Sequence, residues 1–171
     1  MGDSTDERSK ALTHVSEDGS ARMVDVGSKT ETARVAVAEA RISMREATLA
    51  MIEANEIAKG DVLTVARIAA IQAAKRCDEL IPLCHSLPLD ALDVDFDIDR
   101  ERPGILIRCS ARVMARTGVE MEAMTAASIA ALTIYDMCKA VDRDMQIDQL
   151  RLLRKEGGRT GLWERGEGSA A

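Results

Sequence analysis

The stretch that most constrains this chain runs from Gly118 to Val141, because its interior, Ala123–Tyr135, carries no charge. Ala, Met, Leu and Ile dominate it, and most of these residues are strong helix formers. A helix that is apolar on nearly every face is usually buried on nearly every face. The stretch predicts a core helix of about 35 Å. Charged residues occur only near its two ends: Glu120, Glu122, Asp136 and Lys139.

Alternating residues predict an antiparallel sheet around this helix. Apolar residues alternate with aspartates along Leu92–Asp99, which is typical of a strand with one buried and one wet face. A Pro-Gly turn then leads into a second alternating run, Ile105–Val113, and the two form a hairpin. Val35–Met44 and Ile147–Leu153 are expected to add two further strands.

Two shorter helices are expected between the first strand and the hairpin. One spans Arg45–Asn55 with Ser43 as a possible cap. The other spans Val62–Arg76, with Asp61 as its N-cap. The buried face of this second helix is predicted to carry Val65, Ile68, Ala69 and Gln72. Pro82 and Pro88 predict a loop after it. The order of elements indicates an α+β fold with helices on one face of an antiparallel sheet.

The two ends of the chain are polar or rich in glycine. Residues 1–22 are expected to form a disordered tail, and residues 166–171 a flexible C-terminus. Between them, residues 23–165 are expected to form a single catalytic domain. Met23–Lys29 predicts a short edge strand followed by a turn, and Lys155–Arg165 predicts a surface loop and tail.

Composition excludes several classes of function. A net charge of −6 and an aromatic content of 2% argue against nucleic-acid binding, which uses basic surfaces and stacking side chains. The apolar runs are too short to span a bilayer. The four cysteines form no CxxC pair, and the chain opens with charged residues rather than a signal core. We therefore expect reduced thiols in a cytoplasmic protein.

The charged helix ends allow two interpretations each. Asp136 and Lys139 share a helix face, either as a surface ion pair or as a proton-transfer pair in which lost hydration lowers the pKa of the lysine. Glu120 and Glu122 either complement the helix dipole or accept hydrogen bonds from a guanidine-like edge. Spacing alone does not decide between these interpretations.

Metal binding receives little support from spacing. Cys84 and His85 are adjacent, Cys77 lies seven residues earlier, and the other histidine is in the tail. The alternating aspartates lack the glycine of an EF-hand loop. The glycine-rich segment after Lys155 is not a Walker loop. No metal site is predicted, and His85 is expected to contact a ligand or to be a structural group.

Seven segments together resemble the cyclic pyranopterin monophosphate synthase family, also called the molybdenum cofactor biosynthesis protein C family. The resemblance covers about Met23 to Arg165, and the last three segments are highly specific. The segments are Met23–Val26, Lys59–Val62, Ala66–Ala69, Ile71–Lys75, Leu80–His85, Gly118–Ala123 and Thr133–Ala140.

The resemblance implies a ferredoxin-like subunit in a homohexamer, a trimer of dimers with sites at subunit interfaces. It implies a lyase that converts 3′,8-cyclo-7,8-dihydro-GTP to cyclic pyranopterin monophosphate with release of pyrophosphate, without a flavin or metal cofactor. By matching motifs, the catalytic residues are Asp136, Lys139 and Lys59. The substrate-binding residues are Leu83, Cys84, His85, Glu120, Met121, Glu122, Lys29, Arg34 and Lys155.

One position departs from the pattern, because Ser86 stands where the family often has proline. This departure concerns the shape of the loop around His85. Two other functions are compatible with the residues alone. One is a phosphohydrolase of nucleotides or pterins that uses the same pocket. The other is an oligomeric binding scaffold in which the charged helix ends form interface salt bridges.

Overall fold

The computed structural model describes residues 21–159 and 161–166. Its elements follow one another along the chain as β1 (Thr32–Ser43), α1 (Glu46–Glu53), α2 (Val62–Ala74), α3 (Cys77–Leu80), β2 (Ala91–Asp99), β3 (Gly104–Ala115), α4 (Glu120–Cys138), β4 (Gln146–Glu156) and β5 (Trp163–Glu164). The predicted tail, residues 1–22, lies outside the described residues except for its last two. The predicted flexible C-terminus lies outside them except for Gly166.

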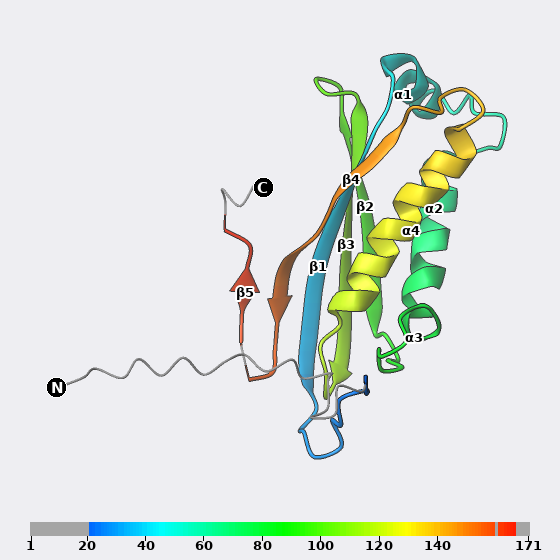
Figure 1. Ribbon diagram of the computed structural model, residues 1–171. Coiled ribbons are helices and arrows are strands. Elements are labelled where there is room, and N and C mark those ends of the chain that lie inside the picture. Colours follow the sequence, from blue (N-terminus) through cyan, green and yellow to red (C-terminus); the bar gives the residue numbers. More distant parts are fainter. Residues whose placement is uncertain (1–20, 160, 167–171) are drawn as a thin grey trace.

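The five strands form one antiparallel sheet in the order β2-β3-β1-β4-β5. Helices α2 and α4 cover one face of it (Figure 1). The predicted α+β, ferredoxin-like architecture is confirmed. The predicted hairpin is also confirmed as β2 and β3, in which Val94 pairs with Cys109 and Phe96 with Ile107.

Helix α4 is the buried rod that the sequence predicts. It spans 19 residues, and its core-facing positions are mostly alanine, including Ala126, Ala127 and Ala130 at 0% exposure. They meet an equally small surface on β1, where Ala38 and Ala40 are also fully buried. Small side chains on both partners let the helix lie close to the sheet. The helix ends then emerge at opposite ends of the sheet (Figure 1).

Helix α2 begins as predicted but buries a different face. Asp61 accepts a hydrogen bond from the Thr64 N–H at 3.0 Å, so the predicted N-cap is confirmed. The predicted apolar face is wrong, because Val65 and Ile68 are 41% and 52% exposed. The buried residues are Val62, Ala66, Ala70, Ala73 and Ala74. The packing of α2 on α4 selects small side chains rather than the most hydrophobic ones.

Helix α1 is present, but Ser43 does not cap it. The N-cap is Arg45, and no side chain of the cap residue takes part. Instead the buried carboxylate of Asp142 accepts hydrogen bonds from the Arg45 N–H at 2.9 Å and from the Thr48 hydroxyl at 3.0 Å. A carboxylate at this position satisfies a free N–H and complements the helix dipole.

Both terminal segments of the fold differ from expectation. Met23–Val26 forms no strand, although the predicted turn follows at Gly27–Lys29. At the other end, Lys155 belongs to β4 rather than to a loop, and Trp163–Glu164 forms β5. Gly157 turns the chain between them with φ +104°, a conformation that favours glycine.

Candidate active site

The N-terminal end of α4 borders a cavity of about 660 Å³. Seven of the predicted substrate-binding residues line it, and apart from Lys29 they come from two separate segments of the chain. The loop before β2 contributes Leu83, Cys84 and His85, and the first turn of α4 contributes Glu120, Met121 and Glu122. Folding therefore brings together two motifs that are about 35 residues apart.

The polar groups in this cavity are held by specific contacts. The His85 ring Nε2 lies 2.8 Å from the carbonyl oxygen of Val24 and so fastens the N-terminal segment over the cavity. The Cys84 thiol donates to Glu122 Oε1 at 3.6 Å. Burial raises the pKa of the Glu122 carboxyl, and it raises the pKa of the Cys84 thiol to about 12. This end of the site is only partly wetted and favours the neutral forms of both groups.

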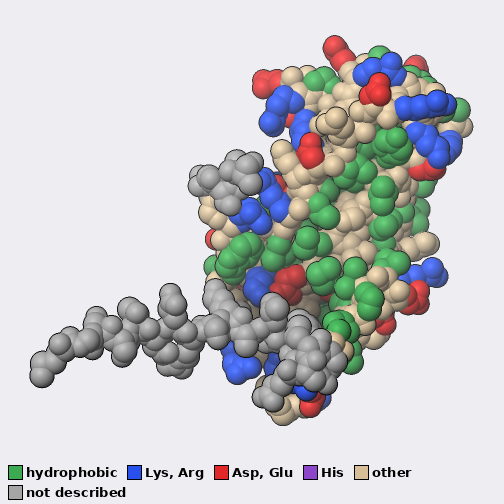
Figure 2. Space-filling model, in the orientation of Figure 1, with side chains coloured by type: hydrophobic (Ala, Val, Ile, Leu, Met, Phe, Trp, Pro, Cys, Tyr) green, Lys and Arg blue, Asp and Glu red, His purple; other side chains and the backbone are tan. Residues whose placement is uncertain are grey.

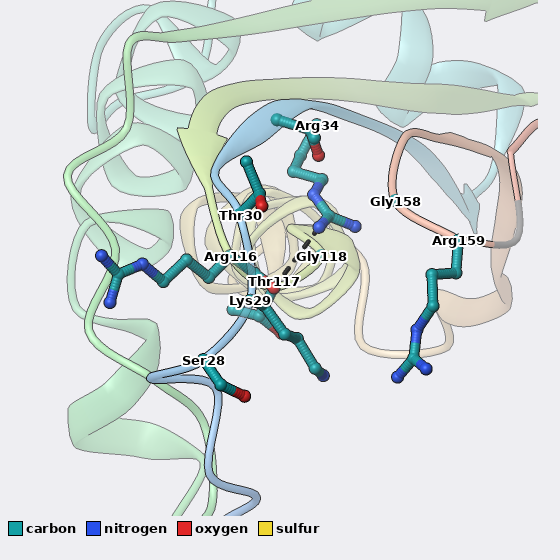
Figure 3. A pocket seen from close by; sticks show the side chains of 10 residues that line it. Ser28, Lys29, Thr30, Arg34, Arg116, Thr117, Gly118, Gly158 and Arg159 are labelled. Atoms are coloured by element: carbon teal, nitrogen blue, oxygen red, sulfur yellow. Dashed lines mark hydrogen bonds between the residues drawn. The ribbon is translucent and has the colours of Figure 1, made fainter.

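A second cavity of about 640 Å³ adjoins the first, because Lys29, Thr117 and Gly118 line both. Its lining includes Arg34 and Arg159, and Figure 3 shows their charged ends and that of Lys29 facing a common space. The Arg34 guanidinium donates to the carbonyl oxygens of Ala115 and Arg116, both at 3.3 Å. Three cations around one space suit a ligand with several phosphates.

Sequence reasoning missed part of this cavity. Arg116 lines it but extends away from the other cations in Figure 3, towards the carbonyl oxygen of Gly27 at 3.2 Å. Arg159 belongs to the glycine-rich segment after Lys155, which could let backbone N–H groups approach a phosphate but is too weak a signal to predict a site. The one local signal for Arg116 is its position directly before Thr117-Gly118, where β3 passes into α4.

Lys155 joins the two cavities to the end of α4. Its Nζ lies 2.8 Å from Glu120 Oε1, and both residues line a small cleft beside Arg34. Gly118 leaves room for this carboxylate, since a Cβ at that position would lie 1.9 Å from Glu120 Oε2. All nine predicted substrate-binding residues therefore gather at the N-terminal end of α4.

The three predicted catalytic residues gather at the opposite end of α4. Asp136 lies 2.7 Å from Lys139 Nζ through one carboxylate oxygen and 2.7 Å from Lys59 Nζ through the other. All three side chains are about half exposed, at 56%, 53% and 47%. We refer to Asp136, Lys139 and Lys59 as the charged triad.

The protonation states in the charged triad follow from its ion pairs. Hydrogen bonds from Lys139 and then from Lys59 lower the pKa of Asp136 to about 2. The hydrogen bond that Lys139 donates to Asp136 raises the pKa of Lys139, which favours the ion-pair interpretation over the one in which lost hydration lowers that pKa. The ion pair outweighs desolvation because the lysine stays in contact with water. The triad thus holds an ionised carboxylate and a protonated lysine.

The two groups lie far apart within one chain. Fourteen residues of helix separate Glu122 from Asp136, which corresponds to about 21 Å. Proton transfer needs its groups within hydrogen-bond reach of the reacting atom. In a single chain the charged triad therefore does not face the cavity that holds the other predicted residues.

A cation-lined cavity and an acid–base cluster on an α+β scaffold are features of an enzyme that acts on a small phosphorylated ligand. Residues 23–158 match the model of the MoaC family. This chain belongs to the MoaC family.

Several proteins named cyclic pyranopterin monophosphate synthase are similar to it over most of their length. The protein from Chloroflexus aurantiacus is 58% identical over 154 residues, 90% of this chain and 94% of the relative. The protein from Thermomicrobium roseum is 54% identical over 159 residues, 93% and 96% of the two chains. The protein from Brucella ovis is 55% identical over 152 residues, 89% and 92% of the two chains.

No helix in the described part of the chain is long and apolar enough to cross a membrane.

Proposed function

We propose that this chain is the lyase that its relatives' name describes. It converts 3′,8-cyclo-7,8-dihydro-GTP to cyclic pyranopterin monophosphate and pyrophosphate in molybdenum cofactor biosynthesis. The observation that carries the proposal is the identity of 54–58% over about nine-tenths of the chain to proteins of that name. The domain that carries this activity is residues 23–165.

The cavities at the N-terminal end of α4 suit the two chemically different ends of this substrate. Lys29 and Arg34 are placed to hold the triphosphate, and Lys155 extends the cationic wall. Glu120 and Glu122 are placed to accept hydrogen bonds from the amino and ring N–H groups of the base. Leu83 and Met121 supply apolar contact beside Cys84 and His85.

The charged triad supplies the proton transfers. The reaction opens one ring, closes another and forms a cyclic phosphate, and each step moves protons. Protonated Lys139 is the acid, and ionised Asp136 holds it in place or accepts a proton in return. Lys59, on the other side of Asp136, adds positive charge that stabilises the leaving pyrophosphate.

The distance of about 21 Å between the two groups supports a site shared between subunits. We propose a homohexamer, a trimer of dimers, in which the triad of one chain completes the cavity of another. The surface offers apolar area for such contacts, since Ile68 and Leu132 are 52% and 53% exposed. Figure 2 shows hydrophobic side chains spread across the middle of one face. Isolated apolar groups are common on surfaces, but contiguous ones mark interfaces.

A cytoplasmic location completes the proposal. All four cysteines are free, and Cys77, Cys109 and Cys138 are buried as thiols. Free thiols persist in reducing compartments. The proposed substrate is a small molecule, and neither nucleic acid nor a membrane takes part.

Incubation with 3′,8-cyclo-7,8-dihydro-GTP tests the reaction. The expected products are one cyclic phosphate and one pyrophosphate for each substrate consumed. Release of inorganic phosphate would instead identify a phosphohydrolase, and unchanged substrate would identify a binding scaffold. The elution volume of the same preparation tests the assembly, because a stable monomer would contradict a site shared between subunits.

A further inference from the structure

Three potential metal ligands converge beneath the cavity at the N-terminal end of α4. Cys77 begins α3, Cys84 lies in the following loop, and Glu122 lies in the first turn of α4. One ligand atom from each lies within 4.8 Å of the other two. Figure 1 shows α3 beside this end of α4. We refer to these three residues as the thiol–carboxylate cluster.

The spacing of the cluster matches a tetrahedral metal site. With bonds of about 2.3 Å to sulfur and 2.0 Å to oxygen, tetrahedral Zn²⁺ holds two sulfurs about 3.8 Å apart and a sulfur and an oxygen about 3.5 Å apart. The Cys77 and Cys84 sulfurs are 3.9 Å apart. Cys84 Sγ and Glu122 Oε1 are 3.6 Å apart. Two edges of the polyhedron are thus present without any movement of the backbone.

The carboxylate of Glu122 independently points to a ligand. This side chain is 2% exposed, and among the described residues its Oε2 atom is buried with no hydrogen-bond partner. Its Oε1 atom receives only the weak donor of Cys84. A buried carboxylate oxygen without a partner is costly, and a bound cation removes that cost.

We propose that Cys77, Cys84 and Glu122 bind a thiophilic divalent cation, with Zn²⁺ as the best match. Two thiolates select such a metal over Mg²⁺ or Ca²⁺, which prefer oxygen ligands. Cys84 and Glu122 also line the cavity of about 660 Å³, so the fourth coordination position is open to it. His85 is not part of the cluster, because neither of its ring nitrogens lies within 4.8 Å of all three ligand atoms.

Binding exchanges protons for the metal. A cysteine thiol must lose its proton to become a metal ligand, and two of the three ligands are thiols. The metal must displace these protons, and its apparent affinity therefore rises as pH rises. Because Cys84 and Glu122 are also substrate-binding residues in the proposed function, an occupied cluster excludes the substrate. That last consequence rests on the proposed function, whereas the binding does not.

The test is a titration of the chelator-treated protein with Co²⁺, under a phosphine reductant that keeps the thiols reduced. Cobalt thiolates show charge-transfer absorbance in the near ultraviolet and a visible spectrum that reports tetrahedral coordination. We expect one tightly bound Co²⁺ per chain and its displacement by Zn²⁺. Cys77→Ser should weaken binding at least about tenfold, since losing even an outer partner of a ligand costs that much.

Cys138→Ser is the matched control, because Cys138 is a buried thiol outside the cluster. It should leave the Co²⁺ spectrum and affinity unchanged, and thermal unfolding of both variants checks that they fold. An unchanged affinity in folded Cys77→Ser, or a spectrum without thiolate bands, would overturn the proposed site. If Co²⁺ binds as expected but product formation from the cyclised substrate is unaffected, the site stands and the exclusion of substrate is wrong.

Discussion

The two ends of helix α4 place carboxylates in opposite environments. At the N-terminal end, Glu122 is 2% exposed and burial raises its pKa. At the C-terminal end, Asp136 is half exposed and bonds to Lys139 and Lys59 lower its pKa to about 2. Both groups belong to the same element and differ only in what surrounds them.

The difference teaches that one rigid helix can serve two tasks. The partly dry end raises the pKa of the Glu122 carboxyl by burial, and its carboxylates suit recognition of N–H groups by hydrogen bonding. The wet end keeps separated charges ready, which suits proton transfer to a substrate. The buried alanines between the ends hold the helix against the sheet and fix the distance between the two groups.

The largest expected effect is the loss of Lys139. Lys139→Ala should reduce kcat/KM for pyrophosphate release by about 10²–10⁴, the range for removal of a general acid. Its unfolding temperature should stay close to that of the unaltered protein, because the side chain is exposed. Lys75→Ala, at another exposed lysine outside the triad, is the control. Equal losses in both variants would show that the effect is not specific to the charged triad.

The second-largest effect is that Glu122 and Asp136 make the stability of the chain depend on pH in opposite directions. Since folding raises the pKa of Glu122, the folded chain binds more protons above the ordinary value of 4.5, and the free energy of unfolding falls as pH rises there. Glu122→Gln should remove this fall and stabilise the chain by about 1–3 kcal/mol at pH 8, since an unpartnered buried charge disappears. Denaturant midpoints across pH measure it.

At Asp136 the sign is reversed. Folding lowers its pKa from 3.8 to about 2, so the stability that it contributes is lost as pH falls through that range. Asp136→Asn should flatten the acid side of the stability profile, and above pH 5 it should lower the free energy of unfolding by a constant amount without changing its slope. A change on the same side of the profile in both variants would contradict the comparison.

The smallest expected effect concerns His85. Its ring contacts the carbonyl oxygen of Val24, and removing one such hydrogen bond costs about 1 kcal/mol. His85→Ala should therefore raise KM, because the N-terminal segment no longer closes the cavity. Faster proteolysis near Val24 is a readout that a purely catalytic role would not produce. Unchanged cleavage would show that His85 does not hold this segment.

Much of the fold follows from local sequence patterns. Alternation predicts β2 and β3, and an uncharged run predicts α4, because each pattern reflects burial of one element. The prediction of the buried face of α2 was wrong because residue volume decides which face is buried. Ala66 and Ala70 fit against α4, whereas Ile68 does not. The capping of α1 by Asp142 involves a residue 97 positions from Arg45, and no local pattern reports it.

The candidate site was predictable from family motifs but not from spacing. The uncharged run already separates Glu120 and Glu122 from Asp136 and Lys139 along one predicted helix, yet only the fold adds the loop around His85 to one end and Lys59 to the other. Lys59 and Asp136, which are 77 positions apart, form an ion pair that no periodicity indicates. The spacing of Cys77 and Cys84 gave no metal site for the same reason, since the third group, Glu122, lies on another helix.

Subunit mixing tests the central claim most directly, namely that the cavity of one chain works with the charged triad of another. Glu122→Gln and Lys139→Ala proteins are each expected to be nearly inactive. When they are dissociated together and reassembled in equal amounts, about a quarter of shared sites should receive two unaltered halves in a symmetric oligomer. Activity should return to about that fraction of the unaltered protein. A mixture no more active than its separate components would contradict the shared site.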